Sequence, residues 1–110
     1  MKDIILKITD REGVFHEISA PTDMAMSVME IIRAYELVKE GTFGVCGGML
    51  LCATCQCYMD SEDIELPEKS MEEDMLLDDA YHVKSNSRLS CQLSLTEILN
   101  GLQLTIAPEQ

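Results

Sequence analysis

The sequence contains no tryptophan, only 5% aromatic residues, and only 8 basic residues against 20 acidic ones in a chain of 110. The formal net charge is therefore −12. Such a surface repels nucleic acids and anionic lipids and favours basic protein partners. The apolar runs are only a few residues long, far short of a membrane span. These scarcities predict a soluble globular protein that binds neither nucleic acid nor membrane.

Targeting signals are also absent from the sequence. The N-terminus, "MKDIILKITD", has no apolar signal-peptide core and no small-residue cleavage site. We therefore expect a cytoplasmic bacterial protein, or a protein of the mitochondrial matrix if a presequence has been removed. The length predicts one domain over residues 1–110.

The first third of the chain predicts a hairpin followed by a helix. Apolar residues alternate over 3–9 and 14–19, which predicts two strands joined by the turn residues between them. Ser27 and Glu30 form a capping box, and apolar residues at helical spacing follow. We expect this helix to end near Gly41.

The second half of the chain mixes short strands with an acidic helix. Strands are predicted at 56–60 and 102–107, and the helix at 71–83 is expected to turn Met71, Met75 and Leu76 inward. Strands and helices that do not alternate regularly indicate an α+β fold.

Four of the five cysteines lie in the stretch "GVCGGMLLCATCQC". Cys46, Cys52 and Cys55 are separated by gaps of five and two residues, and 35 residues separate Cys55 from Cys91. The glycines allow unusual backbone angles and let backbone N–H groups turn towards thiolate and sulfide charge. A tight loop with three ligands and a distant fourth is one way that four thiolates hold a 2Fe–2S cluster.

Other sites can be built from clustered cysteines. A structural zinc site normally has two short Cys/His pairs, whereas this chain has only Cys52 and Cys55 at that spacing. A disulfide framework suits neither an odd number of cysteines nor a reducing compartment. A redox-active C-x-x-C would leave Cys46 and Cys91 without a role. The rival from another functional class is a zinc-stabilised, ubiquitin-like binding module without redox activity.

Three stretches carry a resemblance to a known family. "CGGMLLCATC", "EEDMLLDDAY" and "SRLSCQL" resemble the adrenodoxin-type (vertebrate-type) 2Fe–2S ferredoxins over nearly the whole chain. The resemblance implies a β-grasp fold and one 2Fe–2S cluster. It implies that Cys46 and Cys52 bind one iron and that Cys55 and Cys91 bind the other.

Cys57 is then the cysteine without an iron. We expect a small buried thiol there; a role in sulfur or persulfide handling is the alternative, because cluster-assembly members of the family tend to carry a cysteine at this position. Two features depart from the family pattern. Gln56 stands where the family usually has His, and the bulky Met49, Leu50 and Leu51 stand where it usually has small residues. Both change the surroundings of the cluster and neither removes a ligand.

Half of the acidic residues fall between positions 60 and 79, where Lys69 is the only base. Such a run is usually a solvated helix face. Because the family docks basic partners through the corresponding helix, the resemblance implies a docking surface. Its members would be Glu72, Glu73, Asp74, Asp78 and Asp79. We also expect Arg88, which precedes Cys91, to form a structural ion pair near the cluster.

The resemblance implies a one-electron carrier rather than an enzyme. Its expected electron donor is an NAD(P)H-dependent flavoprotein ferredoxin reductase, and its expected acceptor is a haem-thiolate monooxygenase (cytochrome P-450). The alternative acceptor is the machinery of iron–sulfur cluster assembly. We expect the protein to be a monomer.

Overall fold

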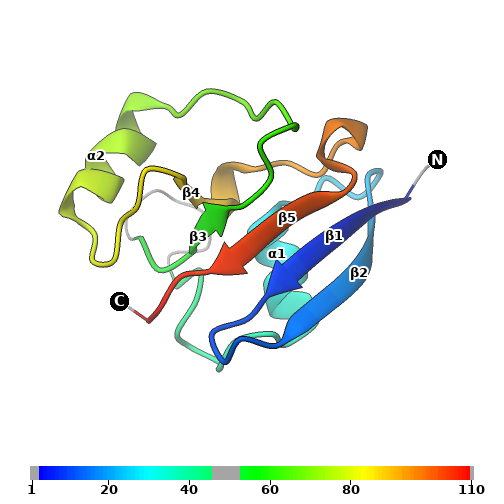
Figure 1. Cartoon of the computed structure of the whole chain (residues 1–110), viewed down its shortest axis with the longest axis horizontal. Helices are drawn as coiled ribbons and strands as arrows, with labels where there is room; N and C mark the ends of the chain where they lie inside the picture. The colour runs from blue at the N-terminus through cyan, green and yellow to red at the C-terminus, as the bar shows by residue number, and fades with distance from the viewer. Residues whose placement is uncertain (1–2, 46–52, 110) are drawn as a thin grey trace.

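A five-stranded mixed sheet forms the centre of the computed structural model, which describes residues 3–45 and 53–109 (Figure 1). The strand order is β2-β1-β5-β3-β4. The strands are β1 (Asp3–Thr9), β2 (Phe15–Pro21), β3 (Gln56–Met59), β4 (Ser87–Leu89) and β5 (Leu102–Ile106). Two α-helices, α1 (Val28–Ala34) and α2 (Met71–Asp79), and two short 3-10 helices, η1 (Ser90–Gln92) and η2 (Glu97–Leu99), complete the described elements.

The predicted hairpin is confirmed. β1 pairs antiparallel with β2, and its alternate residues Ile4, Leu6 and Ile8 are buried. Asp10 closes the turn, because its carboxylate accepts hydrogen bonds from the backbone N–H groups of Glu12 and Val14.

The second half of the sheet is attached through β5. β5 lies parallel to β1 and antiparallel to β3, and β3 in turn pairs antiparallel with β4. α1 lies across one face of the sheet and buries Val28, Ile31 and Ile32 there, while α2 lies beyond the β3–β4 end (Figure 1). This arrangement is the expected α+β, β-grasp fold.

α1 begins where the sequence predicts and ends earlier. The Ser27 side chain accepts from the N–H of Glu30, and the Glu30 side chain accepts from the N–H of Ser27, which is the predicted capping box. The expected end near Gly41 is wrong. The N–H groups of Glu36 and Leu37 donate to Arg33 and Ile32, and Glu36 has a φ of 54°. This is a Schellman motif, in which Glu36 occupies the left-handed position usually taken by glycine.

α2 turns a different face inward from the predicted one. Its buried residues are Glu73 and Leu77, four positions apart, whereas Met71 and Met75 are 75% and 63% exposed. Leu76 is partly buried, as expected. Among the described residues, no helix combines the length and the apolar character that crossing a membrane requires.

Candidate iron–sulfur centre

Two of the predicted ligands, Cys55 and Cys91, meet at the β3–β4 end of the sheet. Cys55 directly precedes β3, and Cys91 lies in η1, directly after β4. The backbone N–H of Ser90 donates to the carbonyl oxygen of Cys55 at 3.0 Å, and the Ser90 hydroxyl donates to the same oxygen at 2.8 Å. The pairing of β3 with β4 therefore brings together two cysteines that are distant in sequence.

The side chains of these two cysteines are also in contact. A side-chain hydrogen bond with Cys91, together with burial, raises the pKa of Cys55 well above its usual range. Two thiolates within hydrogen-bonding reach repel each other, so both thiols can lose their protons only when cations lie against them. The pair therefore fits a centre in which iron is bound by thiolate sulfur.

The other two predicted ligands, Cys46 and Cys52, lie outside the described residues. The structure does describe the residues that flank them. The backbone N–H of Val45 donates to the hydroxyl of Thr54 at 2.8 Å, so the chain before Cys46 and the chain after Cys52 meet next to Cys55. Within residues 3–45 and 53–109, no three His, Cys, Asp or Glu side chains are grouped to hold a metal ion.

α1 supports the chain that leads to Cys46. An Nη1 atom of Arg33 donates to the carbonyl oxygen of Gly44 at 3.3 Å. Gly44 has a φ of +64°, and a Cβ atom there would lie 2.5 Å from Sδ of Met29. Glycine is therefore favoured at this position on two counts, its backbone angle and its close approach to the Met29 side chain.

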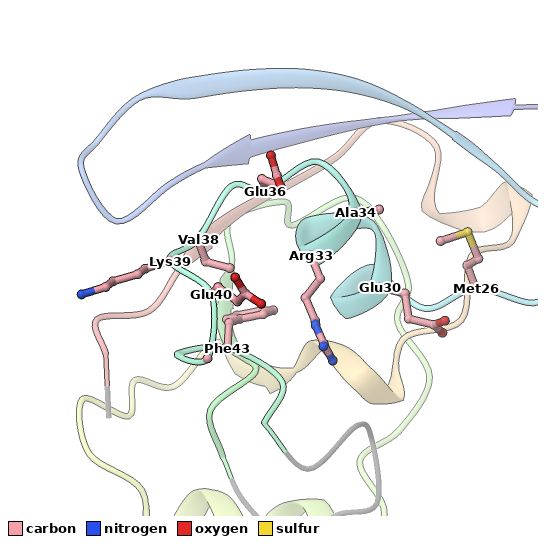
Figure 2. A pocket seen from close by; sticks show the side chains of 10 residues that line it. Met26, Glu30, Arg33, Ala34, Glu36, Val38, Lys39, Glu40 and Phe43 are labelled. Atoms are coloured by element: carbon pink, nitrogen blue, oxygen red, sulfur yellow. The ribbon is translucent and has the colours of Figure 1, made fainter.

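A hollow of about 530 Å³ opens beside this contact, between α1 and the chain that follows it. Figure 2 shows Arg33 extending from α1 into the hollow, with Phe43 and Glu30 on either side. Carboxylates and cations line it together, among them Glu40 and Lys39. Arg33, which lines the hollow, supports Gly44 through its hydrogen bond to the Gly44 carbonyl oxygen. The mixed charges of the lining favour neither anionic nor cationic ligands.

Gln56 connects the centre to the chain after α2. Its side chain is buried; Oε1 accepts from the Ser87 hydroxyl at 2.6 Å, and Nε2 donates to the carbonyl oxygen of Tyr81 at 3.0 Å. Gln56 follows Cys55 directly, so one amide links the ligand segment to β4 and to the chain after α2. Unlike the histidine usual in the family, an amide keeps these bonds without titrating.

One side chain donates a hydrogen bond to a proposed ligand. Nε2 of Gln92 lies 3.3 Å from Sγ of Cys91. A donor at this position stabilises negative charge on the sulfur, and hydrogen bonds to ligand sulfur raise the reduction potential of iron–sulfur clusters.

Cys57 lies on β3 and is fully buried. Burial raises its pKa to about 12, so the thiol is protonated at neutral pH. A side-chain hydrogen bond with Ser90 opposes this shift without cancelling it. These surroundings are those of the small buried thiol that the sequence predicts.

Arg88 forms the expected ion pair, and its partner is Glu73. Nε of Arg88 lies 2.9 Å from Oε2 of Glu73, and that oxygen also accepts from the N–H of Leu89 at 2.8 Å. Nη1 of Arg88 donates to the carbonyl oxygen of Pro67 at 2.7 Å. The pair is buried and joins α2 to β4, just before Cys91.

This pairing corrects one predicted docking residue. Glu73 is 1% exposed, and its carboxylate is occupied by Arg88 and Leu89, so it is not presented to a partner. The four other predicted docking carboxylates are exposed: Glu72, Asp74, Asp78 and Asp79. Met71 and Met75 lie among them on the exposed face, so the prediction that these apolar residues turn inward is wrong.

Comparisons with known proteins identify the family. No protein-family model matches the chain. The chain is 37% identical to rhodocoxin of Rhodococcus erythropolis over 101 residues, which cover 90% of this chain and 91% of that one. It is 35% identical to a 2Fe–2S ferredoxin of Rickettsia conorii over 96 residues, which cover 86% of this chain and 81% of that one. The chain belongs to the adrenodoxin-type 2Fe–2S ferredoxins.

Solved structures agree with this assignment. A ferredoxin of Rhodopseudomonas palustris HaA2 is 30% identical with a TM-score of 0.84, and the match covers 96% of this chain and 98% of that one. A chain of the covalent putidaredoxin reductase–putidaredoxin complex is 26% identical with a TM-score of 0.81, covering 96% and 99%. This ferredoxin is therefore an electron-transfer protein rather than an enzyme, and it carries one 2Fe–2S cluster.

Proposed function

We propose that this ferredoxin, a single domain over residues 1–110, carries single electrons from an NAD(P)H-dependent flavoprotein reductase to a haem-thiolate monooxygenase (cytochrome P-450). The proposed ligands are Cys46, Cys52, Cys55 and Cys91. The observation that carries the ligand assignment is the contact between Cys55 and Cys91, which lie 36 positions apart in sequence and share a side-chain hydrogen bond.

The bound cluster supplies a one-electron couple. The chain supplies its surroundings. Pairing of β3 with β4 holds Cys55 against Cys91, Gln92 donates to the sulfur of Cys91, and Val45 with Thr54 holds the two sides of the ligand loop together. These contacts fix the positions of Cys55 and Cys91 and join the described segments on either side of residues 46–52, so we expect these segments to move little when the charge of the centre changes.

The reductase half of the proposal is supported by a neighbour. Putidaredoxin is found in a covalent complex with its reductase, and that complex contains a chain with this fold. The four exposed carboxylates of α2 suit the same task, because they steer a basic partner without requiring tight binding.

The acceptor half depends on Cys57. A role in cluster assembly through persulfide handling would need an accessible thiol, whereas Cys57 is fully buried on β3. The feature of the sequence that favoured cluster assembly therefore loses its support, so we propose the monooxygenase as acceptor and keep electron donation to cluster assembly as the second candidate.

The cofactor is tested by measuring iron, acid-labile sulfide and the visible spectrum before and after dithionite, followed by EPR of the reduced sample. Two irons, two sulfides and a spin-½ signal are expected. Zinc binding by a colourless protein, after failed anaerobic reconstitution, would contradict the electron-carrier proposal.

Docking is tested by neutralising Glu72, Asp74, Asp78 and Asp79 together. Reduction by the reductase should slow at low salt, and its dependence on salt should become weaker. The charge-matched control neutralises four exposed carboxylates away from α2: Glu12, Glu17, Asp23 and Glu109. An equal effect of both sets would show that net charge matters and that the α2 surface does not.

A further inference from the structure

α2 exposes two methionines in the middle of its acidic surface. Met71 and Met75 are 75% and 63% exposed. They are four residues apart and therefore neighbours on one face of the helix. Asp78 follows Met75 at helical spacing, and Glu72 and Asp74 flank the pair on the sides. We call Met71 and Met75 the methionine pair; it forms an apolar centre with carboxylates around its edge.

The rotation of α2 about its axis keeps the methionine pair outside. Glu73 is bound to Arg88 and to the N–H of Leu89, and Leu77 packs one turn later. Turning the helix to bury Met71 and Met75 would pull Glu73 out of this buried ion pair and leave Arg88 uncompensated. Such an uncompensated buried charge is more costly than two exposed methionines.

We propose that the methionine pair is the apolar centre of the surface that binds the flavoprotein reductase, and that the carboxylates of α2 form its charged rim. This inference rests on the proposed function, in which a reductase supplies the electron. Protein interfaces commonly have an apolar centre and a polar rim, and methionine is enriched in them because its flexible, polarisable side chain adapts to a partner.

The charges decide among possible occupants of this surface. A second copy of the chain would place the same carboxylates against each other, and nucleic acids and anionic membranes are repelled by a chain of net charge −12. A protein with basic residues around an apolar depression can bind both the methionine pair and the carboxylates around it. We assign that chemistry to the reductase.

The position of α2 suits electron transfer. Glu73 of α2 accepts from the N–H of Leu89, two residues before Cys91, and Gln56 links the neighbour of Cys55 to the chain after α2. A partner seated on the methionine pair therefore lies on the outer face of the helix whose inner face contacts the segment that leads to Cys91. The rim and the centre would have different effects: the carboxylates raise the association rate, and the methionine pair lowers the dissociation rate.

The test replaces both methionines with glutamine, which keeps helix propensity and removes the apolar contact. Flavoprotein reductases, putidaredoxin reductase among them, are first screened with the wild-type ferredoxin, and the one that reduces it fastest is used. Binding is then measured by calorimetry at low and high salt. We expect Met71→Gln/Met75→Gln to raise the Kd about tenfold at both salt concentrations, so that the dependence of the Kd on salt stays that of the wild type.

Three controls make the result specific. Met71→Leu/Met75→Leu keeps an apolar centre and should bind within about threefold of wild type. Met24→Gln removes a methionine that is 65% exposed on the connection between β2 and α1 and should leave the Kd unchanged. Far-UV circular dichroism and dithionite reduction verify that each variant folds and holds its cluster.

The outcomes distinguish failure of this inference from failure of the proposed electron-carrier function. An unchanged Kd for the glutamine double variant, or an equal loss for Met24→Gln, overturns the inference and leaves the carrier function intact. Failure of every reductase to reduce the wild-type ferredoxin, while dithionite does reduce it, overturns the proposed reductase and the inference with it.

Discussion

The two α-helices of this ferredoxin use their side chains in opposite ways. α1 buries four apolar residues, Met29 among them, and exposes Glu30 and Arg33. α2 buries Glu73 and exposes Met71 and Met75. α1 is held in place by the apolar core, whereas α2 is held by a buried ion pair and keeps its methionines outside.

The two helices differ because α1 supports the chain near the ligands, whereas α2 forms part of the proposed partner surface. α1 carries the chain that leads to Cys46, through the contacts of Arg33 and Met29 with Gly44, and needs only to be rigid. α2 lies at the proposed partner surface. The buried ion pair between Glu73 and Arg88 fixes the rotation of α2, so its exposed methionines do not turn the helix towards the core.

The largest effect is expected from breaking the anchor of α2. Glu73→Gln leaves the Arg88 guanidinium buried without a compensating charge, which should lower the free energy of unfolding by about 3–5 kcal/mol. Urea unfolding followed by circular dichroism measures the loss. The control is Glu72→Gln on the exposed side of the same helix, which should change the stability by less than about 0.5 kcal/mol. Equal losses in the two variants would show that the ion pair does not hold α2.

The methionines of the two helices provide the next test. Met29→Ala removes a buried side chain from α1 and should cost about 2–4 kcal/mol. Met75→Ala removes an exposed side chain from α2 and should cost less than about 0.5 kcal/mol. Thermal unfolding of both variants under identical conditions makes the comparison, and similar melting temperatures would contradict the assigned burial.

A smaller effect is expected where α1 supports the ligand loop. Gly44→Ala adds a Cβ 2.5 Å from Sδ of Met29 at a φ of +64° and should cost about 2–3 kcal/mol. Gly41→Ala shares the positive φ and meets no atom within 4 Å, so it should cost only about 1 kcal/mol. The difference in urea stability isolates the contact with Met29. Combining Met29→Ala with Gly44→Ala should therefore cost less than the sum of the two single variants.

The smallest predicted effect concerns the start of α1. Ser27→Ala removes the capping box and should lower the stability by about 1 kcal/mol. Far-UV circular dichroism with urea titration measures it, and restoring most of the loss with Ser27→Asp would show that the cap itself is responsible. A loss with Asp as large as with Ala would assign the effect to something else.

The elements predicted correctly are those specified by nearby residues. The alternation of Ile4, Leu6 and Ile8 gives β1, and Ser27 with Glu30 gives the start of α1. The end of α1 was missed because its Schellman motif uses Glu36, which carries none of the conformational signal of a glycine.

The parts that could not be predicted depend on distant partners. No local pattern reveals that Glu73 is buried, because its partner Arg88 lies 15 residues away, and the ordinary rule places glutamate outside and methionine inside. The same holds for Cys55 and Cys91, which have 35 residues between them in the sequence. Only the family resemblance predicts that they bind the same iron.

We propose that Cys46, Cys52, Cys55 and Cys91 bind the cluster and that Cys57 does not. The most direct measurement is the iron and acid-labile sulfide content of Cys91→Ser and Cys57→Ser, each reconstituted under the same anaerobic conditions as the wild type. We predict that Cys57→Ser retains two irons and two sulfides, because its thiol is buried on β3. Cys91→Ser should lose most of both. Equal loss of iron from the two variants, or a full cluster in Cys91→Ser, would contradict the ligand assignment.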